Sequence, residues 1–249
     1  MKDKLIAICR AVLTIIFWLL VWQIAALIVD KEFFLPTIGQ TMKELWSIFR
    51  KKAFPIALLT TLLRVICGIT VGTALGIILA TLSHYSLIAK SIISPFISVV
   101  KSTPVATFII ILWIFLSGNS LPIFIAVLMV MPIIWQNVLD GFGAVNRELA
   151  EVCKLYRFSF KKRVKVLIFP TVLNYFIPAF ITSASLAWKA EIAAEIIAYT
   201  KNSIGGSISD ANSIYKTAEV FAWTLIVITF SILIEALTKF LTRRFKSNA

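Results

Sequence analysis

The chain has 249 residues, of which 59% are hydrophobic and only 15% are charged, and its mean hydropathy is +0.93. A soluble domain needs more polar side chains to cover its surface, so this composition excludes an ordinary soluble protein. The net charge of +13 does not indicate nucleic-acid binding, because the basic residues lie at the ends of apolar runs, as in membrane proteins.

The first apolar run, residues 11–29, predicts a membrane-spanning helix. It is uncharged and close to the ~20 residues that a helix needs to cross the hydrocarbon core. Basic residues precede it, as in a signal peptide. The run is longer than a typical signal-peptide core and lacks a clear cleavage site, so we expect an uncleaved helix.

The basic segment at residues 30–64 contains a helical pattern. Its apolar side chains recur at three- and four-residue steps, at Ile38, Met42, Leu45, Trp46 and Phe49. Charged residues lie off that stripe. The pattern predicts an amphipathic helix at the surface, within a loop outside the membrane spans.

The second expected span covers residues 65–82 and carries a glycine repeat. Gly68, Gly72 and Gly76 are spaced every four residues. Such a stripe of small residues favours close packing against another helix in lipid. The alternative is a glycine-rich helix without a special partner.

The third and fourth expected spans, residues 99–116 and 121–139, are separated only by a short polar turn, which predicts a hairpin. Lys101, Ser102 and Pro104 stand at the start of the third span. One interpretation is that they kink this helix and line a transport pathway. The other is a plain proline in the first turn of a helix.

A charged segment, residues 140–170, follows the fourth span. Seven side chains of this segment are basic: Arg147, Lys154, Arg157, Lys161, Lys162, Arg163 and Lys165. Glu148 and Glu151 stand where negative charge suits the start of a helix. One interpretation is a basic loop that only fixes the membrane topology.

That interpretation does not explain the apolar residues within the charged segment. Leu149, Val152 and Leu155, with Tyr156, form a stripe at helical spacing. An apolar stripe exposed to water is typical of a partner site. The pattern then predicts a turn near residues 158–160 and a second short helix that ends at Pro170.

The fifth and sixth expected spans cover residues 171–190 and 220–241. Glu191 and Glu195 follow the fifth span and would share one helix face. They are either functional groups at membrane depth, where ionisable residues are costly, or hydrated groups in a loop outside the hydrocarbon. The sequence alone leaves both possibilities open.

These elements predict an all-α integral membrane protein with about six transmembrane helices. We expect residues 1–249 to form a single transmembrane domain, with a core at about residues 60–241. Lysine and arginine are more abundant in the segments that lie inside if both termini are cytoplasmic. The positive-inside rule therefore predicts a multi-pass protein of the cell membrane whose charged segment is cytoplasmic.

Neither a metal site nor a catalytic site is expected. The cysteines, Cys9, Cys67 and Cys153, are far apart, and His84 is the single histidine. No HExxH, Gly-x-Ser-x-Gly or phosphate-binding Gly-x4-Gly-Lys-Ser/Thr pattern occurs. We therefore predict no cofactor in this chain, and any ATP must be bound by another chain.

The charged segment resembles the EAA motif of permease subunits of binding-protein-dependent ABC importers. That motif is Glu-Ala-Ala, three residues, Gly, nine residues, Ile, one residue and Leu-Pro. With every interval intact, it falls here on Glu151-Val152-Cys153, Arg157, Leu167 and Phe169-Pro170. Glutamate and proline are kept, and five identities differ. Arginine replaces the glycine at a sharp turn, which arginine adopts only with strain.

Other segments resemble the nitrate/sulfonate/taurine type of these permeases. They are residues 94–104, 185–195, 221–224 and 237–244. The resemblance implies a coupling helix, with Glu151 as its polar anchor and Val152, Leu155 and Tyr156 as its apolar face. It also implies a cytoplasmic ATP-binding subunit and an external substrate-binding protein. One chain with six spans in the lipid bilayer would form half of a pathway, so a homodimer is the simplest assembly, and a heterodimer with a second permease is the alternative.

Two other function classes remain open. A stand-alone secondary transporter is the main alternative, but it would be expected to show internal repeats or paired broken helices. An intramembrane enzyme would need a catalytic constellation, and the motifs for one are absent. Copurification of an ATPase would separate the importer permease from both alternatives.

Overall fold

The computed structural model describes residues 2–116 and 118–247, with side chains at positions 6, 9–10, 12–116 and 118–240. All regular secondary structure in this described part is helical. The elements are α1 (Lys2–Val29), α2 (Ile38–Arg50), α3 (Ala53–Tyr85), α4 (Leu87–Ser102), α5 (Val105–Trp113), α6 (Ser120–Gly143), α7 (Arg147–Leu155), α8 (Phe160–Arg163), the π-helix η1 (Val164–Ile168), α9 (Phe169–Ile197), α10 (Ile204–Ser213) and α11 (Thr217–Ser247).

Five described helical segments are long and apolar enough to cross a membrane. They are Val12–Val29, Ala53–Tyr85, Ser120–Gly143, Phe160–Ile197 and Thr217–Phe240. The α4–α5 pair adds a sixth span only if its two bent halves count as one. The predicted all-α integral membrane fold is therefore confirmed.

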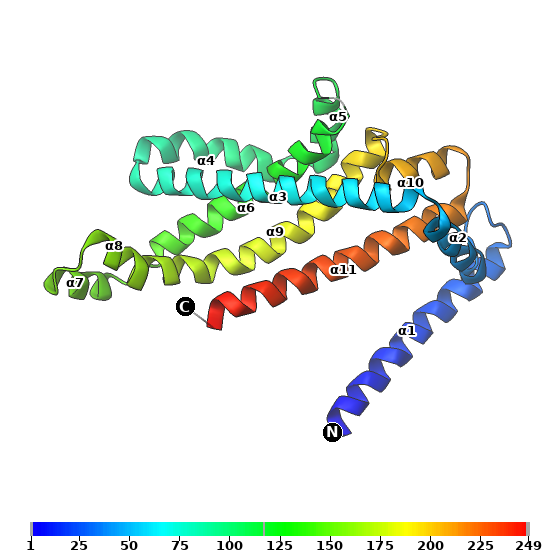
Figure 1. Ribbon diagram of the computed structural model, residues 1–249, viewed down its shortest axis with the longest axis horizontal. Helices are drawn as coiled ribbons and strands as arrows, with labels where there is room; N and C mark the ends of the chain where they lie inside the picture. The colour runs from blue at the N-terminus through cyan, green and yellow to red at the C-terminus, as the bar shows by residue number, and fades with distance from the viewer. Residues whose placement is uncertain (1, 117, 248–249) are drawn as a thin grey trace.

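The long helices α3, α6, α9 and α11 run lengthwise through the molecule (Figure 1). The short helices α7 and α8 lie at one end, and α2 and α10 lie at the opposite end. Helix α1 meets α2 at that second end and then extends away from the bundle. Most of the apolar segment of α1 is exposed, as expected for a helix that faces lipid.

The glycine stripe of α3 is the contact with α6, which confirms the predicted close packing. A Cβ added at Gly68, Gly72 or Gly76 would come within 2.8 Å of the side chains of Ala126, Val130 and Ile134, respectively. Such distances are too short for a real Cβ contact, so the two helix backbones approach closely because these positions lack side chains.

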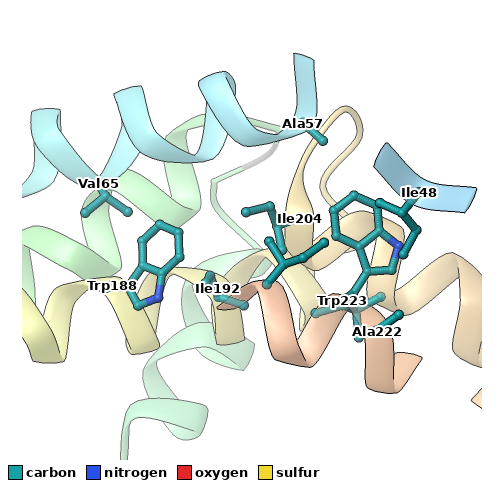
Figure 2. Close-up of a cluster of buried hydrophobic side chains, with 10 residues drawn as sticks. Ile48, Ala57, Val65, Trp188, Ile192, Ile204, Ala222 and Trp223 are labelled. Atoms are coloured by element: carbon teal, nitrogen blue, oxygen red, sulfur yellow. The ribbon is translucent and has the colours of Figure 1, made fainter. Parts of the chain in front are cut away.

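A second apolar cluster joins the helices at the α2 end. Its fully or nearly fully buried side chains include Ile48, Val65, Trp188, Ile204 and Trp223, which come from α2, α3, α9, α10 and α11 (Figure 2). The indole nitrogen of Trp188 donates a hydrogen bond to the carbonyl oxygen of Val227 at 3.2 Å. The cluster therefore fixes α10 and the amphipathic helix α2 against the long helices.

The start of α3 corrects one prediction. The second span does not begin near residue 65, because α3 begins at Ala53. The final part of the segment interpreted as a loop is thus helical, and Arg64 lies inside α3 and is nearly buried. The expected surface helix is confirmed as α2, with bounds Ile38–Arg50.

The third expected span is also corrected. Residues 99–116 do not form one helix, because α4 and α5 meet at a bend of 101°. Pro104 stands at the N-cap position of α5, and Thr103 is extended. A residue before proline disfavours the helical conformation, which accounts for the break at this point. The kink is therefore present, and the lining of a transport pathway by these residues stays a prediction.

Pro170 does not end the helix that precedes it, contrary to expectation. The chain is helical from Phe160 through Ile197. A π-helical turn, η1, comes just before the proline, and the N–H of Phe169 donates to the carbonyl oxygen of Val164. The wider turn accommodates Pro170 near the first residues of α9, so the charged segment leads without interruption into the fifth span.

Candidate functional site

The charged segment contains a short amphipathic helix, α7. Asn146 caps its start, where the side-chain oxygen accepts a hydrogen bond from the N–H of Leu149 at 3.2 Å. Glu148 lies in the first turn and Lys154 in the last, so both charges match the helix dipole. Local sequence alone thus explains why α7 forms at this place.

The apolar stripe of α7 faces outwards. Leu155 is 79% exposed and Tyr156 is 70% exposed, and Leu149 and Val152 are about half exposed. Cys153 points the other way and is buried. The predicted water-exposed stripe is therefore present, and Cys153 belongs to the inner side of the helix rather than to this face.

Arg157 makes the turn that the EAA motif assigns to glycine. Its φ is +50°, in the left-handed region that glycine adopts most easily. The N–H of Arg157 donates to the carbonyl of Lys154, and the N–H of Phe158 donates to that of Cys153, both at 2.9 Å. This is a Schellman-type helix end. The sharp turn is kept, and the arginine carries the backbone strain.

The segment after the turn connects α7 to the long helix α9. The Ser159 hydroxyl caps α8, and Lys162 lies 4.0 Å from the centroid of the Phe158 ring. Leu167 is buried in η1, whereas Phe160 and Phe169 stay exposed. Leu167 therefore anchors the loop to the bundle while the surrounding surface remains open.

A buried polar cluster lies in the other half of the molecule. One guanidinium nitrogen of Arg64 donates to the Oε1 atom of Glu195 at 2.5 Å, and the other donates to the Oδ1 atom of Asn119 at 2.7 Å. The Thr61 hydroxyl lies 2.9 and 3.0 Å from the two carboxylate oxygens of Glu195. The cluster links α3, α9 and the connection before α6.

The start of α10 completes the cluster. The N–H of Gly205 donates to the Oε2 atom of Glu195 at 3.0 Å, and the N–H of Ile204 donates to the Thr61 hydroxyl at 3.1 Å. A Cβ at Gly205 would lie 2.4 Å from the Cβ of Glu195, so this approach requires glycine. The helix N-terminus favours the negative charge of Glu195.

Glu191 lies one helical turn before Glu195, but it has no comparable partners. Both side chains are 0% exposed, so the interpretation of them as hydrated loop residues is wrong. Neither carboxylate oxygen of Glu191 has a hydrogen-bond partner among the described residues. The cluster thus contains one basic group, Arg64, and two acidic groups.

The structure separates Lys101, Ser102 and Pro104 from this cluster. All three are exposed at the bend between α4 and α5. Helix α5 nevertheless packs on α9, because Ile109 belongs to one apolar cluster with Ala190 and Ala194. The bend is therefore attached to the segment of α9 that carries Glu191, although the polar groups themselves do not meet.

Thr61 and Arg64 are the functional candidates that the sequence interpretation missed. The basic count of residues 30–64 led to their assignment to a loop. A useful signal was present, because Arg64 stands within the apolar run Leu62-Leu63-Arg64-Val65-Ile66. An ionisable residue in such a run points to a buried partner of opposite charge.

A cavity of about 640 Å³ opens at the α7 end of the bundle. Its lining combines polar and aromatic side chains, among them Ser83, His84, Lys90, Trp135, Asp140 and Tyr175. The indole nitrogen of Trp135 donates to the Ser83 hydroxyl at 3.0 Å, and His84 stacks on Phe142. The ends of α3 and α6 thus form one wall of a polar opening.

Comparison with known proteins identifies a family. Residues 72–247 match the model for "Binding-protein-dependent transport system inner membrane component". No curated protein matches the sequence. Solved structures do match: an amino acid ABC transporter with histidines aligns with a TM-score of 0.63 and 16% identity, covering 79% of this chain and 94% of that chain.

An inward-facing MetNI methionine ABC transporter also matches, in two crystal forms. The first aligns with a TM-score of 0.59 and 14% identity, covering 83% of this chain and 96% of the other. The second has a TM-score of 0.56 and 14% identity, with coverage of 84% and 97%. At these identities the solved structures support the fold, and the family match covers most of the chain.

Proposed function

Because this chain belongs to the family of binding-protein-dependent transport system inner membrane components, we propose that it forms half of a substrate pathway and drives it through α7. Members of the family are permease subunits of ABC importers, and a separate subunit hydrolyses ATP. The proposal is that α7 docks on this cytoplasmic ATP-binding subunit, while an external binding protein delivers substrate at the opposite end.

The exposed apolar stripe of α7 is the observation that carries the proposal. Leu155 and Tyr156 are mostly exposed on a short capped helix, which favours a protein partner. The stripe is rigidly connected, because Arg157 closes the turn and α8, η1 and α9 continue as one helix. A rigid connection of this kind can convert a movement of the ATPase into a movement of the permease.

The proposed coupling loop spans about residues 140–170 within a single transmembrane domain whose core is about residues 60–241. Glu151 is the polar anchor, and Val152, Leu155 and Tyr156 form the docking face. The remaining motif positions, Cys153, Arg157, Leu167 and Pro170, hold the loop in shape. Cys153 and Leu167 are buried, Pro170 is half-buried, and the exposed Arg157 makes the turn through its φ of +50°.

The experiment is a charge reversal at Glu151. We expect Glu151→Lys to abolish retention of the ATPase on the affinity-purified permease, with normal amounts of permease in the membrane. Glu148→Lys is the matched control, because it makes the same change one turn earlier on the same helix. Full retention of the ATPase by Glu151→Lys would contradict the proposal.

The pathway is proposed to pass the bend and the buried cluster. Lys101, Ser102 and Pro104 mark the exposed bend, and Glu191 and Glu195 mark the neighbouring part of α9. The cavity that His84 and Asp140 line lies at the α7 end, where substrate would leave.

The assembly is proposed to be a homodimer of the nitrate/sulfonate/taurine type in the plasma or inner membrane, with both termini cytoplasmic. One chain with five or six spans makes half of a pathway, and a symmetric pair is the simplest way to complete it. The family match disfavours a stand-alone secondary transporter, because such a protein would need no ATPase.

A further inference from the structure

Only part of the apolar surface of helix α2 is buried in the fold. Leu45 and Ile48 pack into the cluster with Trp223, but Met42, Trp46 and Phe49 point outwards. Trp46 is 61% exposed, and the other two are between two-fifths and half exposed. These three positions are spaced i, i+4 and i+7, so they form one continuous stripe along the helix.

The connections of α2 place it between two apolar candidate spans. The apolar segment of α1 ends at Val29, and the next long span begins at Ala53, only two residues after α2 ends. Lys51, in this connection, is held by Glu219 of α11 at 2.6 Å. The helix therefore cannot move far from the level at which α1 ends and α3 begins.

Basic side chains follow the outer edge of the stripe. Lys43, Arg50 and Lys52 are exposed, and Glu44 is the one acidic residue of α2. The guanidinium carbon of Arg50 lies 5.1 Å from the centre of the Trp46 ring. An aromatic ring with a cation above it has an apolar body and a charged edge, which suits the boundary between acyl chains and headgroups.

We propose that α2 lies in the headgroup layer of the bilayer, at the end of the bundle opposite α7. Met42, Trp46 and Phe49 enter the upper acyl-chain region, and Lys43, Arg50 and Lys52 contact phosphates of anionic lipids. The partner is the bilayer surface, because exposed basic side chains border the stripe and the apolar segments of α1 and α3 flank α2 in the chain. This assignment does not depend on ATPase docking at α7.

The test measures the depth of α2 in lipid. The full chain, with its three cysteines changed to alanine, is reconstituted into vesicles of phosphatidylcholine and phosphatidylglycerol. A fluorescent label is attached at Trp46→Cys or, as the matched control, at Ser47→Cys, which lies about 100° further round α2, on the side of the basic residues. We expect nitroxide-labelled lipid to quench position 46 several-fold more strongly than position 47, and iodide to show the reverse preference.

Either of two outcomes would overturn the proposal. Equal quenching of both positions by iodide would place the stripe in water. Protection of position 46 from both quenchers, with efficient cross-linking between two chains at that position, would place a second copy on the stripe. A label-free measurement avoids reliance on the cysteine variants: brominated lipid should quench wild-type tryptophan emission more than that of Trp46→Phe.

A separate experiment tests the proposed contact of the basic side chains with lipid phosphates. In the Trp46→Cys background, replacing phosphatidylcholine vesicles with the anionic mixture should increase quenching by nitroxide lipid. Arg50→Gln together with Lys52→Gln should remove that increase while leaving the quenching in pure phosphatidylcholine unchanged. An increase of the same size in the double variant would contradict the proposed contact with phosphates.

Discussion

The Arg64–Glu195 cluster and helix α7 are both rich in charged residues, but they use them in opposite ways. In the cluster, each carboxylate oxygen of Glu195 is matched by donors from the same chain, at 2.5 to 3.0 Å. In α7 the charged side chains are exposed, and they surround an apolar stripe whose side chains are half to mostly exposed. Glu195 is thus paired within the chain, whereas the apolar stripe of α7 stays exposed.

This difference indicates where stability and function can be separated. A change within the cluster removes hydrogen bonds that cannot be replaced by water, so it should act on folding. A change on the outer face of α7 removes nothing that the chain itself needs, so it should act on association alone. The next four predictions test this separation, from the largest expected effect on stability to the smallest.

Replacing Arg64 should have the largest effect. Arg64→Leu leaves the carboxylate of Glu195 buried without its cation, and we expect it to lower the free energy of unfolding in detergent by about 3–5 kcal/mol. Arg64→Leu combined with Glu195→Leu should recover much of this loss, because both partners of the buried ion pair are then removed. A single variant as stable as the wild type would show that the ion pair does not hold α3 to α9.

Replacing Glu191 should have the opposite sign. Its carboxylate oxygens have no hydrogen-bond partner among the described residues, so Glu191→Leu should raise the free energy of unfolding by about 1–3 kcal/mol. Glu195→Leu is the matched control, one turn away on α9, and it should destabilise the protein. The measurement is the thermal unfolding midpoint of each variant. The prediction fails if both midpoints shift in the same direction from that of the wild type.

Replacing Arg157 should have a smaller effect, and a stabilising one. Its φ of +50° costs a non-glycine residue about 1–2 kcal/mol, so Arg157→Gly should stabilise the loop by about 1 kcal/mol. Arg163→Gly, in α8, should instead destabilise it, because the backbone there is helical. Hydrogen exchange of the amides of α7 would measure both effects, and equal signs would rule out strain at Arg157.

Replacing Leu155 should hardly change stability. Its side chain is exposed, so Leu155→Ser should alter the free energy of unfolding by less than about 0.5 kcal/mol. The same variant should retain much less ATPase during copurification. Leu167→Ser, in the same loop but buried, should destabilise the permease. If Leu155→Ser unfolded as readily as Leu167→Ser, the outer face of α7 would belong to the fold.

The features that sequence predicted best depend on local spacing. The stripes of α2 and α7 and the glycines of α3 follow helical periodicity, which needs no knowledge of distant residues. The partners of Glu195 could not be predicted in this way. They come from α3 and α10, far away in the chain, and only the packing of the helices brings them to one point.

The misplaced boundaries have a common physical cause. Charged and proline residues were interpreted as ends of helices, but tertiary contacts allow helices to continue through them. Arg64 stays inside α3 because Glu195 neutralises it, and Pro170 follows a π turn that accommodates it. At Pro104 the chain does break, and the bend of 101° divides the third expected span into α4 and α5.

The chain is helical from Phe160 to Ile197, so one long segment connects the α7 end of the molecule to the end that carries Glu195. Its 38 residues, at ~1.5 Å per residue, reach about 57 Å, well beyond the ~30 Å of hydrocarbon in a bilayer. One of its ends is fixed to α7 by the Schellman turn, and the other carries Glu195. Under the proposed coupling, a tilt imposed at α7 would pass along this helix, through the π turn and Pro178, to the hydrogen bonds between Arg64 and Glu195.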